Sequence, residues 1–291
     1  MLHVGNLVLG TAQFGLNYGI NNSHGKPGRE EVFDILEYAY NSGISMLDTA
    51  EAYGNALEII AAYHRKTKGH FKIISKFKYS ANTDITQSIN KTISDLNIEY
   101  LYCYMFHSYL DVINHPELLK RICKMRDDGL VKYIGASIYT NQQLEDVLKK
   151  DEIDLLQLPF NLLDNNLQRG RLIEKAKAAG KIVHIRSVFL QGLFFKDFEL
   201  LAPENVLYPL KQNLRILHNI AQDEQISISA LALQYPLHNS SIDGVLFGVD
   251  TLAQLQQNLD ELKVNIKETV FDEIDRMDVN SRHLLLPINW S

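Results

Sequence analysis

Little in this sequence marks a secreted, membrane-embedded or nucleic-acid-binding protein. Two cysteines occur among 291 residues, Cys103 and Cys123, and they form no disulfide framework, zinc motif or redox motif. No apolar run approaches the roughly 18 residues that a spanning helix needs, and the first residues lack the basic and apolar stretches of a secretion signal. The 35 acidic against 29 basic side chains give a net charge of −6, which argues against the basic surface that nucleic acid or an anionic membrane requires.

These absences predict a cytoplasmic protein that acts on a small molecule, with no nucleic-acid or membrane partner, and they leave the oligomeric state open. Two nucleotide-binding patterns are missing as well. No GxGxxG follows an apolar run, and no GxxxxGK[ST] occurs. Because those glycine-rich turns are the best sequence evidence for a Rossmann or P-loop sheet, an open sheet of either kind loses its main support.

What the sequence does contain is a series of short apolar runs with helix-like segments between them. The apolar runs lie at 7–9, 44–47, 71–75, 101–106, 133–136, 155–156, 182–185 and 245–247. Helical spacing of apolar residues is found at 31–40, 84–96, 118–125, 144–148, 210–221 and 229–235. Gly43, Gly129 and Gly180 stand where a helix should stop before the next strand, since glycine tolerates the left-handed conformation there.

Alternation of strand and helix, repeated eight times, predicts a parallel sheet covered by helices. An eight-unit barrel typically takes about 250 residues, so a chain of 291 has room for one insertion. We therefore predict an α/β fold in which residues 1–291 form a single-domain (β/α)8 TIM barrel. The insertion is expected between the seventh and eighth strands, where the chain from Val183 to Leu246 is long for one unit.

In such a barrel the carboxyl ends of the strands meet at one mouth. The residues that end the apolar runs include Asp48, Lys76, His107, Ser137, Gln157 and Arg186. With Tyr53 shortly after Asp48, they form a candidate proton-transfer group. A free tyrosine has a pKa of about 10, and a nearby ammonium lowers that pKa by stabilising the phenolate. We expect Lys76 to act on Tyr53 in this way, with Asp48 holding Lys76 charged and His107 donating a hydrogen bond to a carbonyl.

Five segments, in order along nearly the whole chain, carry a family resemblance. They are LDTAEAYG at 47–54, SK at 75–76, FHS at 106–108, GAS at 135–137 and LQ at 156–157. Together they resemble the successive signatures of the aldo-keto reductase superfamily. The resemblance implies a barrel that binds NADP(H) or NAD(H) without a Rossmann fold or a metal and passes hydride to an aldehyde or ketone. Asp48, Tyr53, Lys76 and His107 are then the catalytic residues, with Tyr53 as the general acid.

The same resemblance implies where the cofactor lies. Ser137 and Gln157 would hold the nicotinamide carboxamide, while the loop after the seventh strand and the segment 248–258 would hold the pyrophosphate and adenosine. The cofactor-binding residues expected on this basis are Ser137, Gln157, Arg186, Gly192, Gly248, Asp250, Gln254 and Asn258.

Three positions depart from the family pattern. Ile138 stands where many members have an asparagine, which weakens the expectation of one carboxamide contact. Arg186 occupies the place of an aromatic ring that stacks on nicotinamide. Its charge should favour the neutral reduced ring over the cationic oxidised ring, or it should meet an anionic group of the substrate. In the loop and helix after the eighth strand, members that favour NADP commonly have lysine or arginine, whereas this chain has Gly248, Val249, Asp250 and Gln254. Because a carboxylate repels a 2′-phosphate and accepts a hydrogen bond from a ribose hydroxyl, NAD remains open beside NADP.

Other interpretations stand beside these. Asp48 is a candidate helix cap, His107 a candidate structural histidine, and Asp250 or Thr251 is expected to cap the helix that follows. Two other functions are also open: a nicotinamide-binding regulatory subunit with little turnover, and a lyase or isomerase that forms a Schiff base on Lys76.

Several residues outside the motifs carry weaker expectations. His184, inside an apolar run, is expected to be a hydrogen-bonded core histidine. By its position in the loop after the first strand, Tyr18 is a candidate substrate contact. Asn161 and Asp164 either line the mouth or turn the chain. The apolar tail at 284–290 is expected to fold over the barrel or to meet another subunit.

Overall fold

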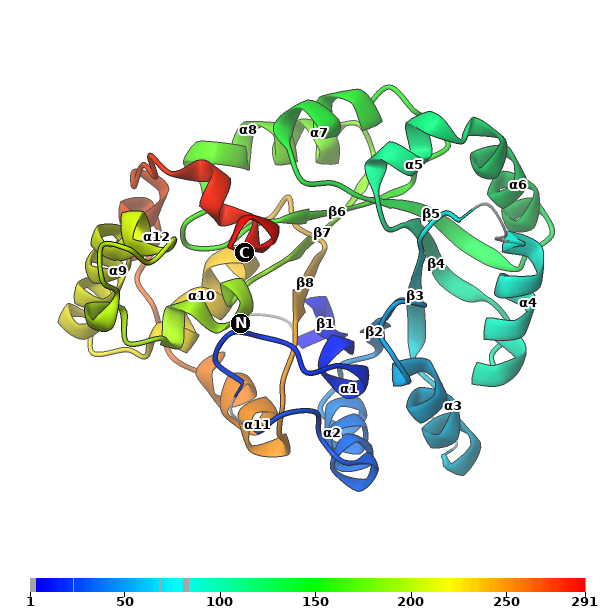
Figure 1. Cartoon of the computed structure of the whole chain (residues 1–291), viewed down its shortest axis with the longest axis horizontal. Helices are drawn as coiled ribbons and strands as arrows, with labels where there is room; N and C mark the ends of the chain where they lie inside the picture. Colours follow the sequence, from blue (N-terminus) through cyan, green and yellow to red (C-terminus); the bar gives the residue numbers. More distant parts are fainter. Residues whose placement is uncertain (1–3, 23, 68–69, 81–83, 291) are drawn as a thin grey trace.

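The computed structural model describes residues 4–22, 24–67, 70–80 and 84–290. Eight parallel strands close into a barrel, in which each strand pairs with the next and β8 pairs with β1 (Figure 1). The strands are β1 Leu7–Gly10, β2 Met46–Asp48, β3 Lys72–Phe77, β4 Leu101–Phe106, β5 Val131–Ser137, β6 Leu155–Pro159, β7 Ile182–Arg186 and β8 Gly244–Phe247. The predicted (β/α)8 barrel is confirmed, and each apolar run of the sequence overlaps its strand.

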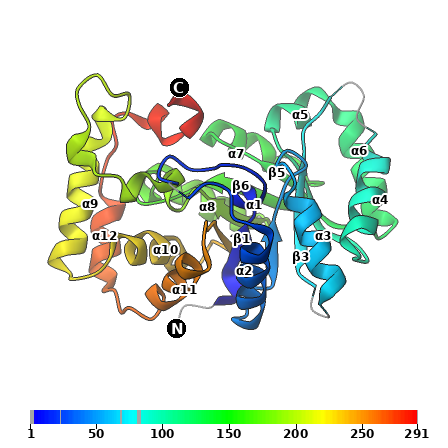
Figure 2. The same cartoon turned by 60° about the horizontal axis from the view of Figure 1, so that its bottom comes forward.

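Helices form a layer around the barrel (Figures 1 and 2). They are α1 Ala12–Gly15, α2 Arg29–Asn41, α3 Ala56–Lys66, α4 Ile85–Leu96, α5 Tyr109–Asn114, α6 Pro116–Asp127, α7 Asn141–Val147, α8 Asn166–Ala178, α9 Lys211–Asp223, α10 Ile228–His238, α11 Leu252–Glu261 and α12 Glu268–Asp275. The helices bury the apolar stripe that their spacing predicts; in α4, for example, Ile85, Ile89 and Leu96 are buried. Asp84 caps α4 by accepting hydrogen bonds from two backbone N–H groups of its first turn.

The predicted helix ends are confirmed at the glycines. Gly43, Gly129 and Gly180 have φ angles of +93°, +79° and +77°. Glycine adopts this left-handed region without the steric cost that a side chain would add. Each of these helices can therefore stop and turn directly into the next strand.

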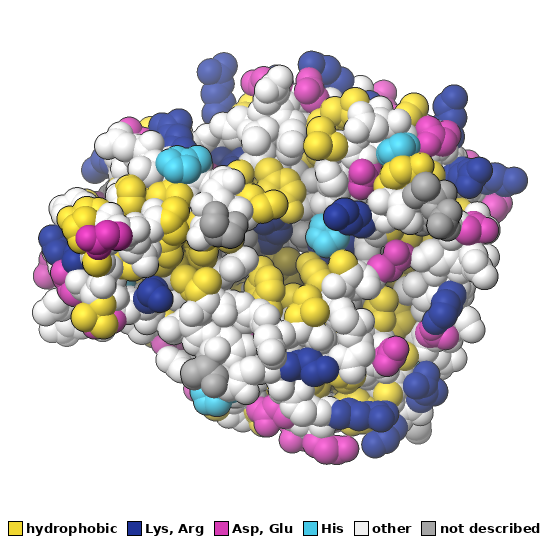
Figure 3. All heavy atoms as spheres, viewed as in Figure 1, with side chains coloured by type: hydrophobic (Ala, Val, Ile, Leu, Met, Phe, Trp, Pro, Cys, Tyr) yellow, Lys and Arg dark blue, Asp and Glu magenta, His cyan; other side chains and the backbone are white. Residues whose placement is uncertain are grey.

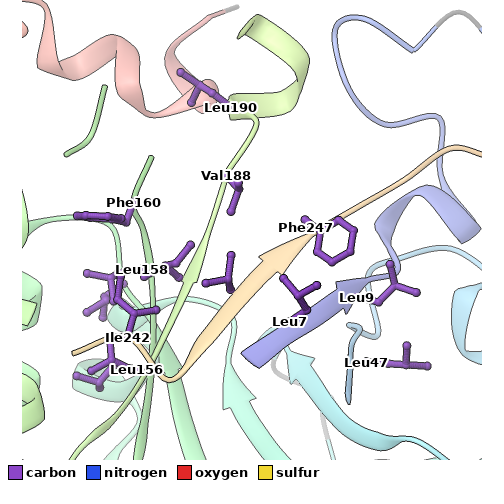
Figure 4. Packing of buried hydrophobic residues seen from close by; sticks show 14 of the residues in the cluster. Leu7, Leu9, Leu47, Leu156, Leu158, Phe160, Val188, Leu190, Ile242 and Phe247 are labelled. Carbon is purple, nitrogen blue, oxygen red and sulfur yellow. The ribbon is translucent and has the colours of Figure 1, made fainter. Parts of the chain in front are cut away.

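Side chains of the strands alternate between the inside of the barrel and its outer face. Inside, a buried apolar cluster is formed by Val8, Ile74, Cys103, Met105 and Leu155. On the outer face, Leu9 of β1 and Phe247 of β8 lie side by side in the cluster that packs under the helices (Figure 4). Because Lys76 lies two residues beyond Ile74, and Asp48 two beyond Met46, both polar side chains point inward, above the apolar filling.

The expected insertion between β7 and β8 contains α9, α10 and three short 3-10 turns at Leu190–Phe195, Phe198–Leu200 and Tyr208–Leu210. In both views α9 lies beside α12 at the edge of the molecule (Figures 1 and 2). The tail packs against its own chain: Leu284 and Leu285 are buried, and the indole N–H of Trp290 donates to the Leu284 carbonyl at 2.7 Å. Among the helices of the described chain, none is long and apolar enough to cross a membrane.

Candidate active site

One cavity of about 620 Å³ is lined by residues from the carboxyl ends of the strands. The face drawn in Figure 3 is hollowed near its middle, with hydrophobic, basic and histidine side chains around the hollow. The cavity is lined by every residue that the sequence predicts for catalysis or cofactor binding: Asp48, Tyr53, Lys76, His107, Ser137, Gln157, Arg186, Gly192, Gly248, Asp250, Gln254 and Asn258. Parallel strands bring these residues together because their carboxyl ends share one mouth.

A buried ion pair lies at the floor of the cavity. The amine of Lys76, on β3, contacts Oδ1 of Asp48, on β2, and the two side chains are 2% and 1% exposed. The amine also donates to the carbonyl of Thr49 at 3.2 Å. Burial alone would lower the pKa of Lys76, but Asp48 and Tyr53 outweigh burial and raise the pKa above its ordinary value. Lys76 therefore remains an ammonium, and Asp48 is no helix cap.

Tyr53 shares this part of the cavity with Lys76 and His107. The amine of Lys76 is 5.2 Å from the centre of the Tyr53 ring, and the imidazole of His107 lies edge-on to that ring with 6.1 Å between centroids. The loop that carries Tyr53 is fixed by backbone bonds: the N–H of Thr49 donates to Ile74 at 2.8 Å, and the N–H of Glu51 donates to Lys76 at 3.0 Å. Backbone bonds to β3, the strand that carries Lys76, thus hold the Tyr53 ring near the Lys76 ammonium.

His107 follows the last residue of β4, and its backbone N–H donates to Phe77 at 2.9 Å. Burial, together with the positive charge of Lys76, lowers the pKa of His107 to about 4. The imidazole is therefore neutral at pH 7. A neutral ring carries one N–H donor, which can donate to a carbonyl oxygen without adding a proton to it.

Gln157 tests whether the floor fits a nicotinamide. Its Nε2 donates to Oδ2 of Asp48 at 2.7 Å, whereas its Oε1 is buried with no hydrogen-bond partner in the part of the chain that the structure describes. A buried acceptor without a partner is costly, and a carboxamide NH2 would satisfy it. Ser137, its partner in the β5–β6 register, lines the same cavity. These residues fit the carboxamide that the family resemblance implies at this place.

Arg186, at the end of β7, stacks on an aromatic ring of the protein itself. Its guanidinium carbon is 4.4 Å from the centre of the Tyr139 ring. Two further contacts are long: one N–H donates to the Ser187 hydroxyl at 3.3 Å and another to the Ile138 carbonyl at 3.5 Å. Ile138 is fully buried, so its side chain belongs to the core.

The loops after β1 and β8 meet beside the cavity. Thr251 caps α11 by accepting from the N–H of Gln254 at 3.2 Å, so Asp250 is not the cap. The carboxylate of Asp250 instead accepts from the side-chain amide of Asn22 at 3.1 Å, and its backbone N–H donates to Oε1 of Gln254 at 2.6 Å. Burial raises the pKa of Asp250 above its usual range. The segment 248–258 presents no lysine or arginine to this part of the cavity.

Comparison with known proteins places the chain in a family. A sequence profile described as the aldo/keto reductase family matches residues 6–279. The chain belongs to the aldo/keto reductase family. Among relatives of this aldo/keto reductase, the NADH-specific methylglyoxal reductase of Escherichia coli is 21% identical over 84% of this chain and 86% of its own length. A probable aldo-keto reductase 1 of Glycine max is 22% identical, covering 88% of this chain and 82% of its own.

Solved structures of the family share the fold of this aldo/keto reductase. The holo form of the aldo-keto reductase AKR11C1 from Bacillus halodurans superposes with a TM-score of 0.75 at 17% identity, over 96% of this chain and 94% of that chain. The thermostable aldo-keto reductase Tm1743, in complex with the inhibitor epalrestat, gives a TM-score of 0.69 at 23% identity, over 93% of this chain and 94% of that chain. At these sequence identities, the structural similarity shows only that the chains share the barrel fold.

The cavity of this aldo/keto reductase also contains residues that the sequence did not single out. They include Gln13, Asn21, Asn22, Tyr139, Gln191, Ser227 and Ser229. Tyr18 lines the cavity as its position indicated, and its hydroxyl accepts from the amide of Gln191 at 3.3 Å. Most of these residues lie on loops or helix starts without a strand-end signal, so only the folded chain brings them to the mouth.

Three of the residues with weaker expectations lie outside the cavity and have structural roles. Asn161 turns the chain, because its Oδ1 accepts from the backbone N–H groups of Leu163 and Asp164. Asp164 pairs with Arg169 at 2.6 Å. His184 is a core histidine as expected, but its Nδ1 is buried without a hydrogen-bond partner among the described residues. Burial lowers the pKa of His184 to about 4, which removes the need to solvate a charge.

Proposed function

We propose that this aldo/keto reductase reduces an aldehyde or ketone with NADH or NADPH, and that Tyr53 is the general acid. The observation that carries the proposal is the buried Asp48–Lys76 ion pair under Tyr53, with a neutral His107 in the same cavity. Proton transfer by a positioned side chain accelerates a reaction typically 10²–10⁴-fold.

The roles follow from charge. The substrate oxygen lies between Tyr53 and His107, where the neutral imidazole donates a hydrogen bond that orients the carbonyl. Tyr53 gives its proton to that oxygen, and the ammonium of Lys76 stabilises the phenolate that remains. Asp48 keeps Lys76 charged and in place. The bound nicotinamide cofactor supplies the hydride.

We propose that Ser137 and Gln157 hold the carboxamide, since the free Oε1 of Gln157 suits an NH2 group. The remaining cofactor contacts are assigned to Gly192, Gly248, Asp250, Gln254 and Asn258, which line the rest of the cavity. Asp250 favours NADH, because its carboxylate repels a 2′-phosphate and accepts from a ribose hydroxyl. The name of the Escherichia coli relative, an NADH-specific reductase, agrees with that preference.

The Schiff-base alternative fits the site less well. A lysine that attacks a carbonyl must be neutral, which usually requires a lowered pKa, whereas Asp48 and Tyr53 raise the pKa of Lys76 despite its burial. Borohydride trapping of a carbonyl compound on Lys76 without any cofactor would favour that alternative.

Two measurements test the proposal. Titration with NADH and NADPH separately, followed by the fluorescence of the reduced cofactor, should show binding of at least one, with NADH the tighter. A panel of aldehydes and ketones that includes methylglyoxal should then show oxidation of the bound cofactor. Binding without turnover across the panel would favour the regulatory subunit, and binding of neither cofactor would refute both interpretations.

A further inference from the structure

A guanidinium without a carboxylate partner lies in the mouth of the barrel, and we propose that it selects substrates in which an oxyanion accompanies the carbonyl. This inference rests on the proposed carbonyl reduction and concerns its substrate class. Arg186 is partly buried at the end of β7 and lines the same cavity as Tyr53 and His107. A group attached to a carbonyl held by those two residues therefore shares the cavity with the guanidinium.

The charge of Arg186 is not neutralised by any carboxylate that the structure describes. Among the described residues no carboxylate lies within ion-pair distance of it, and Asp164, an acidic residue whose pKa the charge of Arg186 lowers, is already paired with Arg169 at 2.6 Å. Asp48 is paired with Lys76. The positive charge of Arg186 is felt at His107, where it adds to the effects of burial and Lys76 in lowering the imidazole pKa. The cavity thus contains a positive charge that no carboxylate of the described residues neutralises.

The hydrogen-bonding capacity of Arg186 is also mostly free. A guanidinium has five N–H donors in a planar fork. To acceptors among the described residues Arg186 uses two of them, at 3.3 Å to Ser187 and 3.5 Å to Ile138, beyond the usual 2.9–3.0 Å of a strong bond. The guanidinium carbon lies over the Tyr139 ring, and the other donors of the fork have no acceptor among the described residues. A planar edge of donors matches a carboxylate, which can accept two parallel bonds.

The surroundings hold this plane in position. The carbonyl of Tyr139 accepts from Arg169 at 2.9 Å, and the carbonyl of Ser187 accepts from the side chain of Asn161 at 3.1 Å. Ser187 itself has a φ of +63°, a left-handed conformation that a serine keeps only when its neighbours impose it. Both loops that frame Arg186 are anchored from outside the cavity, so little ordering is required when an anion binds.

Two aromatic aldehydes of nearly equal size provide the test. 4-Carboxybenzaldehyde and 4-nitrobenzaldehyde have similar planar para groups, but only the carboxylate carries a charge. We expect the protein to have a higher kcat/KM for the carboxylate, and Arg186→Gln to lower the ratio of the two kcat/KM values by roughly 10- to 100-fold, the usual effect of losing hydrogen bonds to a charged group. Arg186→Lys, which keeps the charge without the planar fork, should give an intermediate ratio.

Lys78 offers a matched control, because it is an exposed cation whose charge also reaches His107. Lys78→Gln should leave the ratio within about twofold, since it removes only long-range attraction that water screens. An equal loss in both variants would overturn the assignment to Arg186. Because both aldehydes react with the same bound cofactor, weaker cofactor binding lowers both rates and leaves the ratio unchanged. A ratio that Arg186→Gln does not alter would therefore overturn the proposal, and an equal fall in both kcat/KM values would place Arg186 at the cofactor.

A second measurement does not depend on turnover. Calorimetric titration with benzoate should give a weaker affinity for Arg186→Gln than for the unmodified protein and Lys78→Gln, and equal affinities would refute the anion site. If the unmodified protein reduces neither these aldehydes nor any member of the panel above, the proposed reductase activity fails while the benzoate titration still tests Arg186. If it reduces the nitro compound with no preference for the carboxylate, only the anion proposal fails.

Discussion

Tyr53 differs from phenylalanine by one hydroxyl, and the proposed reaction depends on that group. We expect Tyr53→Phe to bind the cofactor with unchanged affinity and to lose 10²–10⁴-fold in kcat, because it removes the proton donor and little volume. Single-turnover measurements with saturating cofactor, together with a fluorescence titration, separate the two effects. Retention of the full kcat would refute the role of Tyr53.

The lowered pKa of His107 predicts that the pH profile of kcat/KM has no step near pH 6.5. Its pKa of about 4 lies below the ordinary value of about 6.5, so the imidazole keeps the same neutral form from pH 7 to pH 5. We expect kcat/KM to show no titration of this residue in that range and to fall only as the pH approaches 4. A step near 6.5 that His107→Gln abolishes would contradict this assignment.

At the scale of single residues, the sequence predicts the cavity well where a side chain is tied to a strand end. Asp48, Lys76 and His107 are of this kind, because strand period and barrel closure fix where they point. The sequence does not predict the stacking of Arg186 on Tyr139, since that contact depends on how two loops bend. The cap at Thr251 is decided by side-chain geometry that leaves Asp250 free for Asn22.

The loop between β2 and α3 is held by a close approach of backbones. A Cβ on Gly54 would lie 2.3 Å from the carbonyl oxygen of Gly15, at the end of α1, and Gly54 has a φ of +53°. Only glycine fits both the space and the conformation. The side chain of Glu51 adds a further tether, because its carboxylate accepts from the buried Tyr104 hydroxyl at 2.9 Å. The position of Tyr53 thus depends on contacts with α1 and β4.

We therefore expect Gly54→Ala to destabilise the fold by about 1–3 kcal/mol, through strain at positive φ and the clash with α1, and to lower kcat because Tyr53 shifts. Thermal unfolding and steady-state kinetics measure the two effects. Gly5→Ala is the control, since no atom of the described residues lies within 4 Å of a Cβ there. Equal thermal stability and equal kcat in the two variants would show that the loop between β2 and α3 tolerates movement.

Over the whole molecule, strand and helix order could be predicted because apolar runs and helical spacing alternate so regularly. The path of the insertion could not be, since 3-10 turns such as Leu190–Phe195 have no periodic signal. That turn contains positive φ angles at Leu190, Gln191 and Gly192, which tertiary contacts impose: the N–H of Ile20, on the loop after β1, donates to the Gln191 carbonyl at 3.0 Å.

His184 should make global stability depend on pH. Its folded pKa is about 4, whereas the unfolded value is about 6.5, so between these values the unfolded chain binds a proton that the folded chain excludes. The free energy of unfolding should therefore fall as the pH drops from 6.5 to 4, by at most about 1.4 kcal/mol per pH unit from this group. Urea denaturation at pH 7, 6 and 5 should show a shallower dependence in His184→Gln, whatever its absolute stability. If the free energy of unfolding depended equally on pH in both proteins, His184 would be ruled out as the source of the dependence.

The imidazole of His184 fills a space that the neighbouring strand leaves open. A Cβ on Gly244, its partner in the β7–β8 register, would lie 2.6 Å from that ring. The two positions share a single volume, so neither can be exchanged for a larger residue without the other shrinking. Related barrels that carry alanine or more at the place of Gly244 should therefore have a smaller residue opposite, and the two sites should evolve as a pair.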